Sequence, residues 1–144
     1  MTFAGIRAKI DHLRANLVEL ARLPQDRAPF LADAHFVYAA IYLLQTSVQA
    51  LIDLGIYVTA RLGLSIPSRS ADILDALEQA GHLPAGSTLR FRPMFAFRNR
   101  VVHLYDRVEP DVVHRIATTK RADLEELLRL LLVALESTDV EGES

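Results

Sequence analysis

The sequence has no cysteine, and it contains only six glycines and six prolines in 144 residues. The lack of cysteine excludes disulfides, thiolate nucleophiles and cysteine-ligated metals. The five histidines are scattered without an H-x-x-x-H pair, so we expect neither a metal centre nor a cofactor. With 51% hydrophobic residues and so few glycines and prolines, the chain is predicted to form a folded, helix-rich domain.

Net charge is also small, at −2, but it is unevenly distributed. Residues 90–115 hold six arginines against three acidic residues, a net charge of +3, which leaves −5 for the rest of the chain. A local basic patch is sufficient to hold a phosphate backbone, whereas arginines spread around a solvated helix would have no such role. The arginines of this basic segment are Arg90, Arg92, Arg98, Arg100, Arg107 and Arg115.

A signal peptide is not expected, because the N-terminus lacks the apolar run and cleavage site of such a segment. Residues 36–60 carry a single charge, Asp53, and could be mistaken for a membrane span. Polar side chains interrupt the middle of this stretch, where a bilayer would make them costly. The sequence therefore predicts a buried helix and a cytoplasmic protein without membrane association.

Apolar residues recur at three- and four-residue steps, which is the spacing of helices that bury one face. Ser70 and Ser87 are predicted helix caps, and Pro93 should kink the fourth helix or mark the start of its regular part. We expect an all-α, up-and-down bundle of four to five helices that forms one domain over residues 1–138. Residues 139–144 are expected to form a disordered acidic tail. The predicted helices span residues 3–22, 29–62, 71–80, 87–105 and 110–137.

The long second helix is apolar on two sides, so either its own bundle or another subunit must cover it. Its polar exception is Gln45, Gln49 and Asp53, which follow one another at steps of four. This stripe is either a narrow solvated seam or a wall of polar groups that faces a reactive site.

The stretch from Phe97 to Tyr105 concentrates the chemically active side chains of the sequence. Helical spacing places Arg98 on the same face as two preceding phenylalanines. A buried guanidinium requires either a carboxylate partner or an anionic ligand. Asp53, the only charge in the middle of the long helix, is the predicted carboxylate partner.

Asn99 and His103 are four residues apart and share the adjoining face. In an ideal helix His103 points about 140° away from Arg98. Both groups can reach one phosphate if the helix ends near Val102 or if two copies of the helix face each other; we expect a composite site at a dimer interface. An imidazole can act as general acid or base, and a guanidinium can bind a pentacoordinate phosphorane. This pair suits metal-independent RNA cleavage, in which the 2′-hydroxyl is the nucleophile.

The order Arg98-Asn99-x-x-x-His103-x-Tyr105 resembles the R-x4-H-x-Y motif of the HEPN superfamily, in particular its HepT branch (the DUF86 proteins). The similarity extends from about Ala34 to Leu135. It departs from the family at Leu104, where many relatives have glycine.

This resemblance implies a homodimeric endoribonuclease toxin of a type VII-like toxin–antitoxin pair, with Arg98, Asn99 and His103 as catalytic residues. Asp53 and Arg100 are possible supporting residues. The implied partner is a minimal nucleotidyltransferase antitoxin, MntA, which transfers AMP onto the motif tyrosine, Tyr105 in this sequence. The alternative is a dimeric subunit that partners a nucleotidyltransferase without cleaving RNA.

Overall fold

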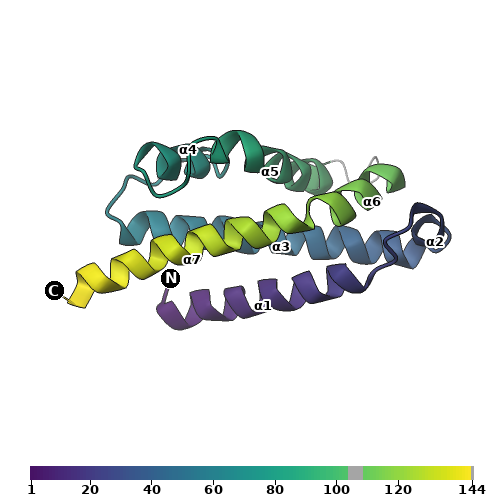
Figure 1. The fold of residues 1–144 in the computed structure, drawn as a ribbon, viewed down its shortest axis with the longest axis horizontal. Helices are drawn as coiled ribbons and strands as arrows, with labels where there is room; N and C mark the ends of the chain where they lie inside the picture. The colour runs from purple at the N-terminus through teal and green to yellow at the C-terminus, as the bar shows by residue number, and fades with distance from the viewer. Residues whose placement is uncertain (104–108, 144) are drawn as a thin grey trace.

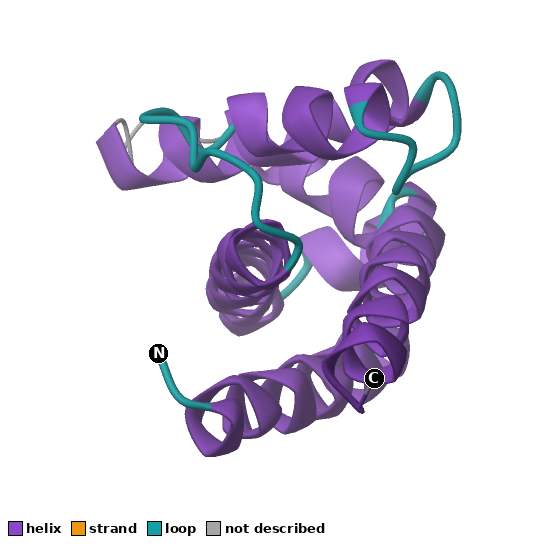
Figure 2. Ribbon diagram, turned by 90° about the vertical axis from the view of Figure 1, so that its left-hand side faces the viewer, coloured by secondary structure: helices purple, strands orange, loops and turns teal. Residues whose placement is uncertain are grey.

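The computed structural model describes the backbone of residues 1–103 and 109–143 and the side chains of residues 1–100 and 109–138. Over this described part, the backbone forms only helices and connecting loops (Figure 2). The predicted all-α bundle is confirmed, with seven helices in place of four or five. These helices are α1 (Phe3–Arg22), α2 (Arg27–Leu31), α3 (Ala34–Arg61), α4 (Asp72–Gln79), α5 (Ser87–His103), α6 (Pro110–Thr119) and α7 (Arg121–Glu143).

Helix α3 is the centre of the bundle, because each of the other six helices packs against it. In Figure 1, α1 lies below α3, and α4 and α5 lie above it. The chain itself therefore covers most of the two apolar faces of α3. By length and composition α3 could cross a membrane, but 61% of its most apolar window is buried inside the protein. Tyr38 and Tyr42 remain 58% exposed on its N-terminal half.

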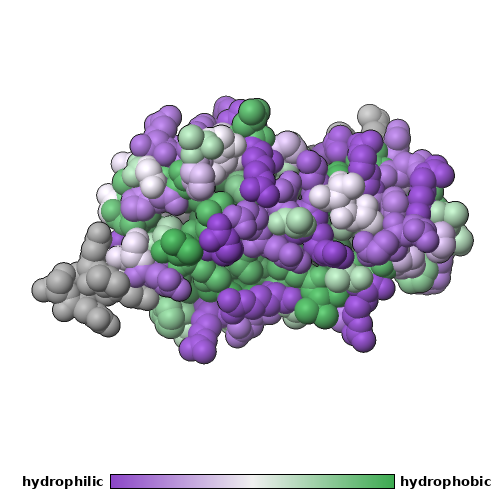
Figure 3. Space-filling model, in the orientation of Figure 1, coloured by the Kyte–Doolittle hydropathy of each residue, from purple (hydrophilic) through white to green (hydrophobic). Residues whose placement is uncertain are grey.

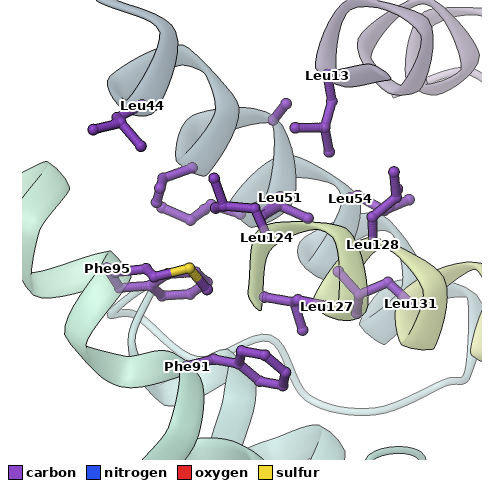
Figure 4. Close-up of a cluster of buried hydrophobic side chains, with 14 of the residues drawn as sticks. Leu13, Leu44, Leu51, Leu54, Phe91, Phe95, Leu124, Leu127, Leu128 and Leu131 are labelled. Atoms are coloured by element: carbon purple, nitrogen blue, oxygen red, sulfur yellow. The ribbon is translucent and has the colours of Figure 1, made fainter. Parts of the chain in front are cut away.

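The core is formed where α1, α5 and α7 meet the middle of α3 (Figure 4). Leu13 of α1, Leu51 of α3, Phe91 of α5 and Leu127 of α7 are each at most 1% exposed. At roughly 1.5–3 kcal/mol for each fully buried large side chain, this cluster is the main source of stability. On the surface shown in Figure 3, most of the area is hydrophilic, and a hydrophobic band follows the boundary between α7 and α1.

The predicted second helix is in fact two helices, α2 and α3, with a break at Ala32 and Asp33. Asp33 has extended backbone angles, and its carboxylate accepts a hydrogen bond from the backbone N–H of His35 at 2.9 Å. Asp is a favoured N-cap residue because its side chain satisfies a free N–H at the helix start. The apolar spacing continues across this cap, which is why periodicity alone predicted one helix.

The predicted last helix is also divided, into α6 and α7, with Lys120 between them. The hydroxyls of Thr118 and Thr119, which precede the break, donate to backbone carbonyls four residues earlier in the chain. Such bonds compete with the helical backbone pattern and favour helix ends. The break places Lys120, which interrupts the apolar face in the sequence, at the junction of two helices.

The backbone of residues 139–143 is helical in the structure, where the sequence predicted a disordered acidic tail. Thr138 just before this segment is buried, so α7 is anchored up to that residue. Adding residues to an existing helix costs little, since each new residue gains a hydrogen bond without a new nucleation step. The domain boundary at residue 138 remains a prediction.

Neither predicted serine cap is present. Helix α4 begins without a side-chain cap hydrogen bond, so Ser70 does not cap it. The hydroxyl of Ser87 donates to a backbone carbonyl three residues earlier instead of accepting from the helix. Glu78 of α4 takes over this role, because its Oε1 accepts from the backbone N–H of Thr88 at 2.7 Å. This hydrogen bond joins α4 to the start of α5 and lowers the pKa of Glu78 below its ordinary value of 4.5.

The cap at Glu78 predicts a pH-dependent stability. A lowered pKa in the folded state means that the stabilisation is complete above pH 4.5 and is lost as the pH falls through the folded-state pKa. We expect the melting temperature of Glu78→Gln to fall less than that of the wild type on acidification below pH 4.5, measured by circular dichroism. The control is Glu136→Gln, which removes a carboxylate that accepts no hydrogen bond from the described residues. If the melting temperatures of Glu78→Gln and the wild type fall equally below pH 4.5, Glu78 does not stabilise the protein through this cap.

Candidate functional site

A polar seam crosses the middle of the bundle and links α1, α3 and α5. Its members are Lys9, Gln49, Asp53, Arg98 and Asn99. Lys9 Nζ contacts Asp53 Oδ2 at 2.5 Å, and Gln49 Nε2 donates to Asp53 Oδ1 at 3.0 Å. Gln49 Oε1 then accepts from Arg98 Nη2 at 2.5 Å. The polar stripe of α3 therefore faces the motif arginine on one side and Lys9 on the other.

Asp53 is not the direct partner of Arg98, contrary to the sequence-based prediction. Its carboxylate is engaged by Lys9 and Gln49, and its side chain is only 16% exposed. Lys9 occupies this position because α1 packs along α3, a pairing that spacing within one helix cannot reveal. Gln49 is interposed as a neutral link, so the charge of Arg98 is not neutralised by any carboxylate among the described residues.

Arg98 is half-buried on α5, and the two phenylalanines that share its face, Phe91 and Phe95, are buried as predicted. Its Nη1 donates to Asn99 Oδ1 at 3.1 Å, and its Nε is buried without a hydrogen-bond partner in the described part of the chain. A guanidinium has five N–H donors, and the two described hydrogen bonds leave three of them. A fixed, un-neutralised guanidinium with free donors is suited to bind a phosphate or carboxylate.

The other predicted site residues lie at the C-terminal end of α5. This helix continues through Pro93, so of the two predicted effects of this proline a start of the regular part at Pro93 is wrong. Asn99 and Arg100 are exposed. The backbone is helical up to His103, so the helical spacing used for Arg98 and His103 is retained along this segment. The side chain of His103 and the whole of Tyr105 lie outside the described residues.

The arginines of the basic segment divide into two groups. Arg90 and Arg92 make ion pairs, with Asp123 at 2.8 Å and Asp75 at 3.5 Å. Arg100 and Arg115 make no ion pair with the described residues, and Arg107 lies outside them. The excess positive charge is therefore concentrated near the end of α5 and on α6.

Arg100 and Arg115 line an open groove of about 210 Å³ between α5 and α6. We call this the basic groove and define it by three cations, Arg100, Arg115 and Lys120, and by the apolar Pro93, Val112 and Ile116. The charge of residues 90–115 predicted a basic patch but not this groove, because the groove residues come from two helices and from the break before α7. Its signal in the sequence is Lys120, a cation inside an otherwise apolar stripe.

Comparison with known proteins identifies one family. The model of the HepT-like family, described as ribonuclease HepT-like, matches residues 13–131. A tri-AMPylated HEPN toxin of Shewanella oneidensis, solved in complex with an MNT antitoxin, superposes with a TM-score of 0.80. The two sequences are 22% identical over 92% of this chain and 99% of the toxin.

A second solved structure, a toxin–antitoxin with AMP-PNP, gives a TM-score of 0.78 at 22% identity and covers 91% of this chain and 99% of that one. A mutant of an MntA toxin–antitoxin pair gives 0.79 at 22% identity, over 89% and 98% of the two chains. These structures share the fold of this chain. A comparison with curated protein sequences gave no match.

The contact between Gln49 and Arg98 predicts a measurable loss of stability. Gln49→Leu removes the hydrogen bonds to Arg98 Nη2 and to Asp53 Oδ1, both in half-buried surroundings, so we expect the free energy of unfolding to fall by about 1–3 kcal/mol. Urea unfolding followed by circular dichroism measures this loss. The matched control is Gln45→Leu, one turn earlier on α3 and equally half-buried. If the two variants have the same stability, the hydrogen bonds of Gln49 to Arg98 and Asp53 contribute nothing to it.

Proposed function

Because this chain belongs to the HepT-like ribonuclease family, we propose that it is a toxin that cleaves RNA and is silenced by a nucleotidyltransferase antitoxin. This proposal rests on the hydrogen bonds and the unneutralised charge of Arg98. Its guanidinium is positioned by Gln49, has no described carboxylate to neutralise it and retains free donors. A purely structural arginine at this depth would be expected to have a carboxylate partner.

The proposed chemistry needs only the RNA and the motif side chains. The imidazole of His103 accepts the proton of a ribose 2′-hydroxyl, and the 2′-oxygen attacks the adjacent phosphorus. A bond forms between the phosphorus and the 2′-oxygen, and the bond to the 5′-oxygen of the next nucleotide breaks. The leaving oxygen takes up a proton from water, and protonated His103 returns its proton to the solvent, so the products are a 2′,3′-cyclic phosphate and a 5′-hydroxyl. The 2′-hydroxyl supplies the nucleophile, so we propose a metal-independent reaction.

Arg98 acts on the charge that develops at phosphorus. In the pentacoordinate state the non-bridging oxygens gain negative charge, and the planar guanidinium offers two parallel donors to them. Asn99 Oδ1 accepts from Nη1 of this guanidinium at 3.1 Å, and Gln49 Oε1 accepts from its Nη2 at 2.5 Å. Asp53 supports the arrangement indirectly, since its carboxylate fixes the amide of Gln49. Arg100, exposed one residue beyond Asn99, adds positive potential for the RNA backbone.

The catalytic site is proposed to be shared between two copies of the chain. Arg98 and His103 are separated by about 140° around a regular helix, so one α5 directs them to different faces. Two α5 helices that face each other across a homodimer would bring Arg98 of one copy near His103 of the other. The dimer thus completes a site that one protomer only half contains.

Regulation is proposed to act through Tyr105. The similar HEPN toxin is tri-AMPylated and was solved with an MNT antitoxin, and a related toxin–antitoxin was solved with AMP-PNP. By analogy, an MntA-like nucleotidyltransferase transfers AMP from ATP to the hydroxyl of Tyr105 and releases pyrophosphate. The new phosphodiester brings negative charge and bulk close to the motif, where it competes with the RNA phosphate. We propose a cytoplasmic location, where RNA and a nucleotidyltransferase supplied with ATP would both be available.

The catalytic roles are tested by Arg98→Ala and His103→Ala. We expect each to reduce RNA cleavage and growth arrest by at least about 100-fold, the usual contribution of a positioned acid–base or oxyanion-binding group. Cleavage is followed by gel electrophoresis of labelled RNA, and the oligomeric state by light scattering. Arg92→Ala and His82→Ala are matched controls outside the proposed site. Full activity of both test variants would exclude Arg98 and His103 from catalysis, whereas a wild-type chain that cleaves no RNA would support the non-catalytic binding subunit.

The modification is tested by Tyr105→Phe. Incubation with the cognate transferase and ATP should add adenylyl groups to the wild-type chain, detected by intact mass spectrometry, and none to the variant. Because the variant has no hydroxyl to receive AMP at this position, it should still cleave RNA in the presence of transferase and ATP. Tyr38→Phe, which alters an exposed tyrosine of α3, is the control. Adenylylation of the Tyr105→Phe protein at wild-type level would exclude this tyrosine as the acceptor.

A further inference from the structure

The basic groove between α5 and α6 has a charge that the described structure leaves uncompensated. Arg100 and Arg115 make no ion pair with the described residues, and Lys120 Nζ lies 3.9 Å from Asp123 Oδ2. The same carboxylate is already bound by Arg90 at 2.8 Å. Three cations thus line one small groove, and none of the described residues that line it is acidic.

The acidic residue closest in sequence to the groove does not neutralise it. Asp111, next to Val112, pairs with Arg27 at 2.6 Å, and that contact ties α6 to α2. Like charges held together on two neighbouring helices repel each other, so the arrangement favours an anionic occupant.

The walls of the groove are apolar as well as basic. Pro93 is exposed and Val112 and Ile116 are half-exposed, while the buried Met94 and Phe97 form the floor. The guanidinium of Arg100 lies 5.8 Å from the centroid of the Phe97 ring. Arginine planes and aliphatic walls accept the faces of nucleobases, and the same arginines bind phosphate. The groove therefore offers contacts to both parts of a nucleotide.

The groove is of a size to hold one segment of a longer ligand. At about 210 Å³ and open to solvent, it is smaller than the roughly 300–1,000 Å³ of sites that enclose a whole small molecule. A single nucleotide of a strand would occupy it and continue beyond it on both sides.

The groove and the catalytic motif share helix α5, because Arg100 lines the groove and Arg98 belongs to the motif. Arg98 and Arg100 are separated by only about 3 Å along the helix axis but lie on different faces. A strand that crosses α5, which is about 10–12 Å wide with its side chains, can contact both. We propose that the basic groove binds a nucleotide of the RNA substrate that flanks the cleaved phosphate. This inference rests on the proposed ribonuclease function and adds a substrate-positioning site to it.

Arg115 and Lys120 are the residues to test, because Arg100 belongs to the motif segment and could also act in catalysis. The variants are Arg115→Glu and Lys120→Glu, with Arg14→Glu, an exposed arginine of α1, as the charge-matched control. Circular dichroism checks that each variant is folded. The probe is a fluorescein-labelled, 2′-O-methylated single-stranded RNA, which cannot be cleaved through its 2′-oxygen, and binding is measured by anisotropy at several salt concentrations.

We expect Arg115→Glu and Lys120→Glu to weaken binding of this probe by about tenfold each, and the slope of log affinity against log salt to fall by about 0.7 per lost phosphate contact. Arg14→Glu should bind like the wild type. With unmodified RNA, the groove variants should raise KM by a similar factor and keep kcat within about twofold, because the lost contact binds substrate and transition state equally.

Wild-type affinity and wild-type salt dependence in both groove variants would overturn the groove proposal, even if the chain cleaves RNA. Weaker binding to the antitoxin with unchanged RNA binding would also overturn it, because the groove would then be a protein interface. If Arg98→Ala and His103→Ala retain full activity while the groove variants lose the probe, the proposed catalytic site fails and the groove stands as an RNA-binding site.

Discussion

A polar side chain on the buried faces of α3 needs a hydrogen-bond partner inside the protein, because all six of the other described helices pack against α3. A buried polar atom without a hydrogen bond costs several times what a satisfied one contributes. Gln49 and Asp53 meet this constraint by linking to Lys9 of α1 and Arg98 of α5. The seam that results fixes the relative position of three helices and holds the motif arginine by its Nη2 atom.

The composition of this seam has a consequence for chemistry. A carboxylate in direct contact with Arg98 would neutralise the guanidinium and compete with a phosphate for its donors. The structure places the neutral amide of Gln49 there and keeps the carboxylate of Asp53 one residue further away, bound to Lys9. Arg98 is thereby oriented while its charge remains available. A phosphate-binding arginine must be held in place without being neutralised. Gln49 orients Arg98, and Lys9 binds the carboxylate of Asp53, so both residues support the site.

Helix boundaries determine the basic groove. If residues 110–137 formed one continuous helix, Lys120 would lie within the apolar face of that helix and compete with the core. The break between α6 and α7 places Lys120 at the end of α6, beside Arg115 and across from Arg100. Here its side chain is 42% exposed, so its charge is solvated. A feature that looks unfavourable in the sequence is therefore accommodated by a local end of helix.

The sequence by itself determined the all-α class, the exact span of α1, the burial of Phe91 and Phe95 and the family motif, because these depend on spacing along one helix. It could not determine contacts between helices. The partner of Asp53, the link through Gln49, the cap that Glu78 provides for α5 and the groove lined by Arg100 and Arg115 all join segments distant in the chain. Only the packing of α1, α4, α5 and α6 around α3 brings these side chains within hydrogen-bonding or electrostatic range. The tertiary structure alone therefore decided which charges are paired and which remain free for a ligand.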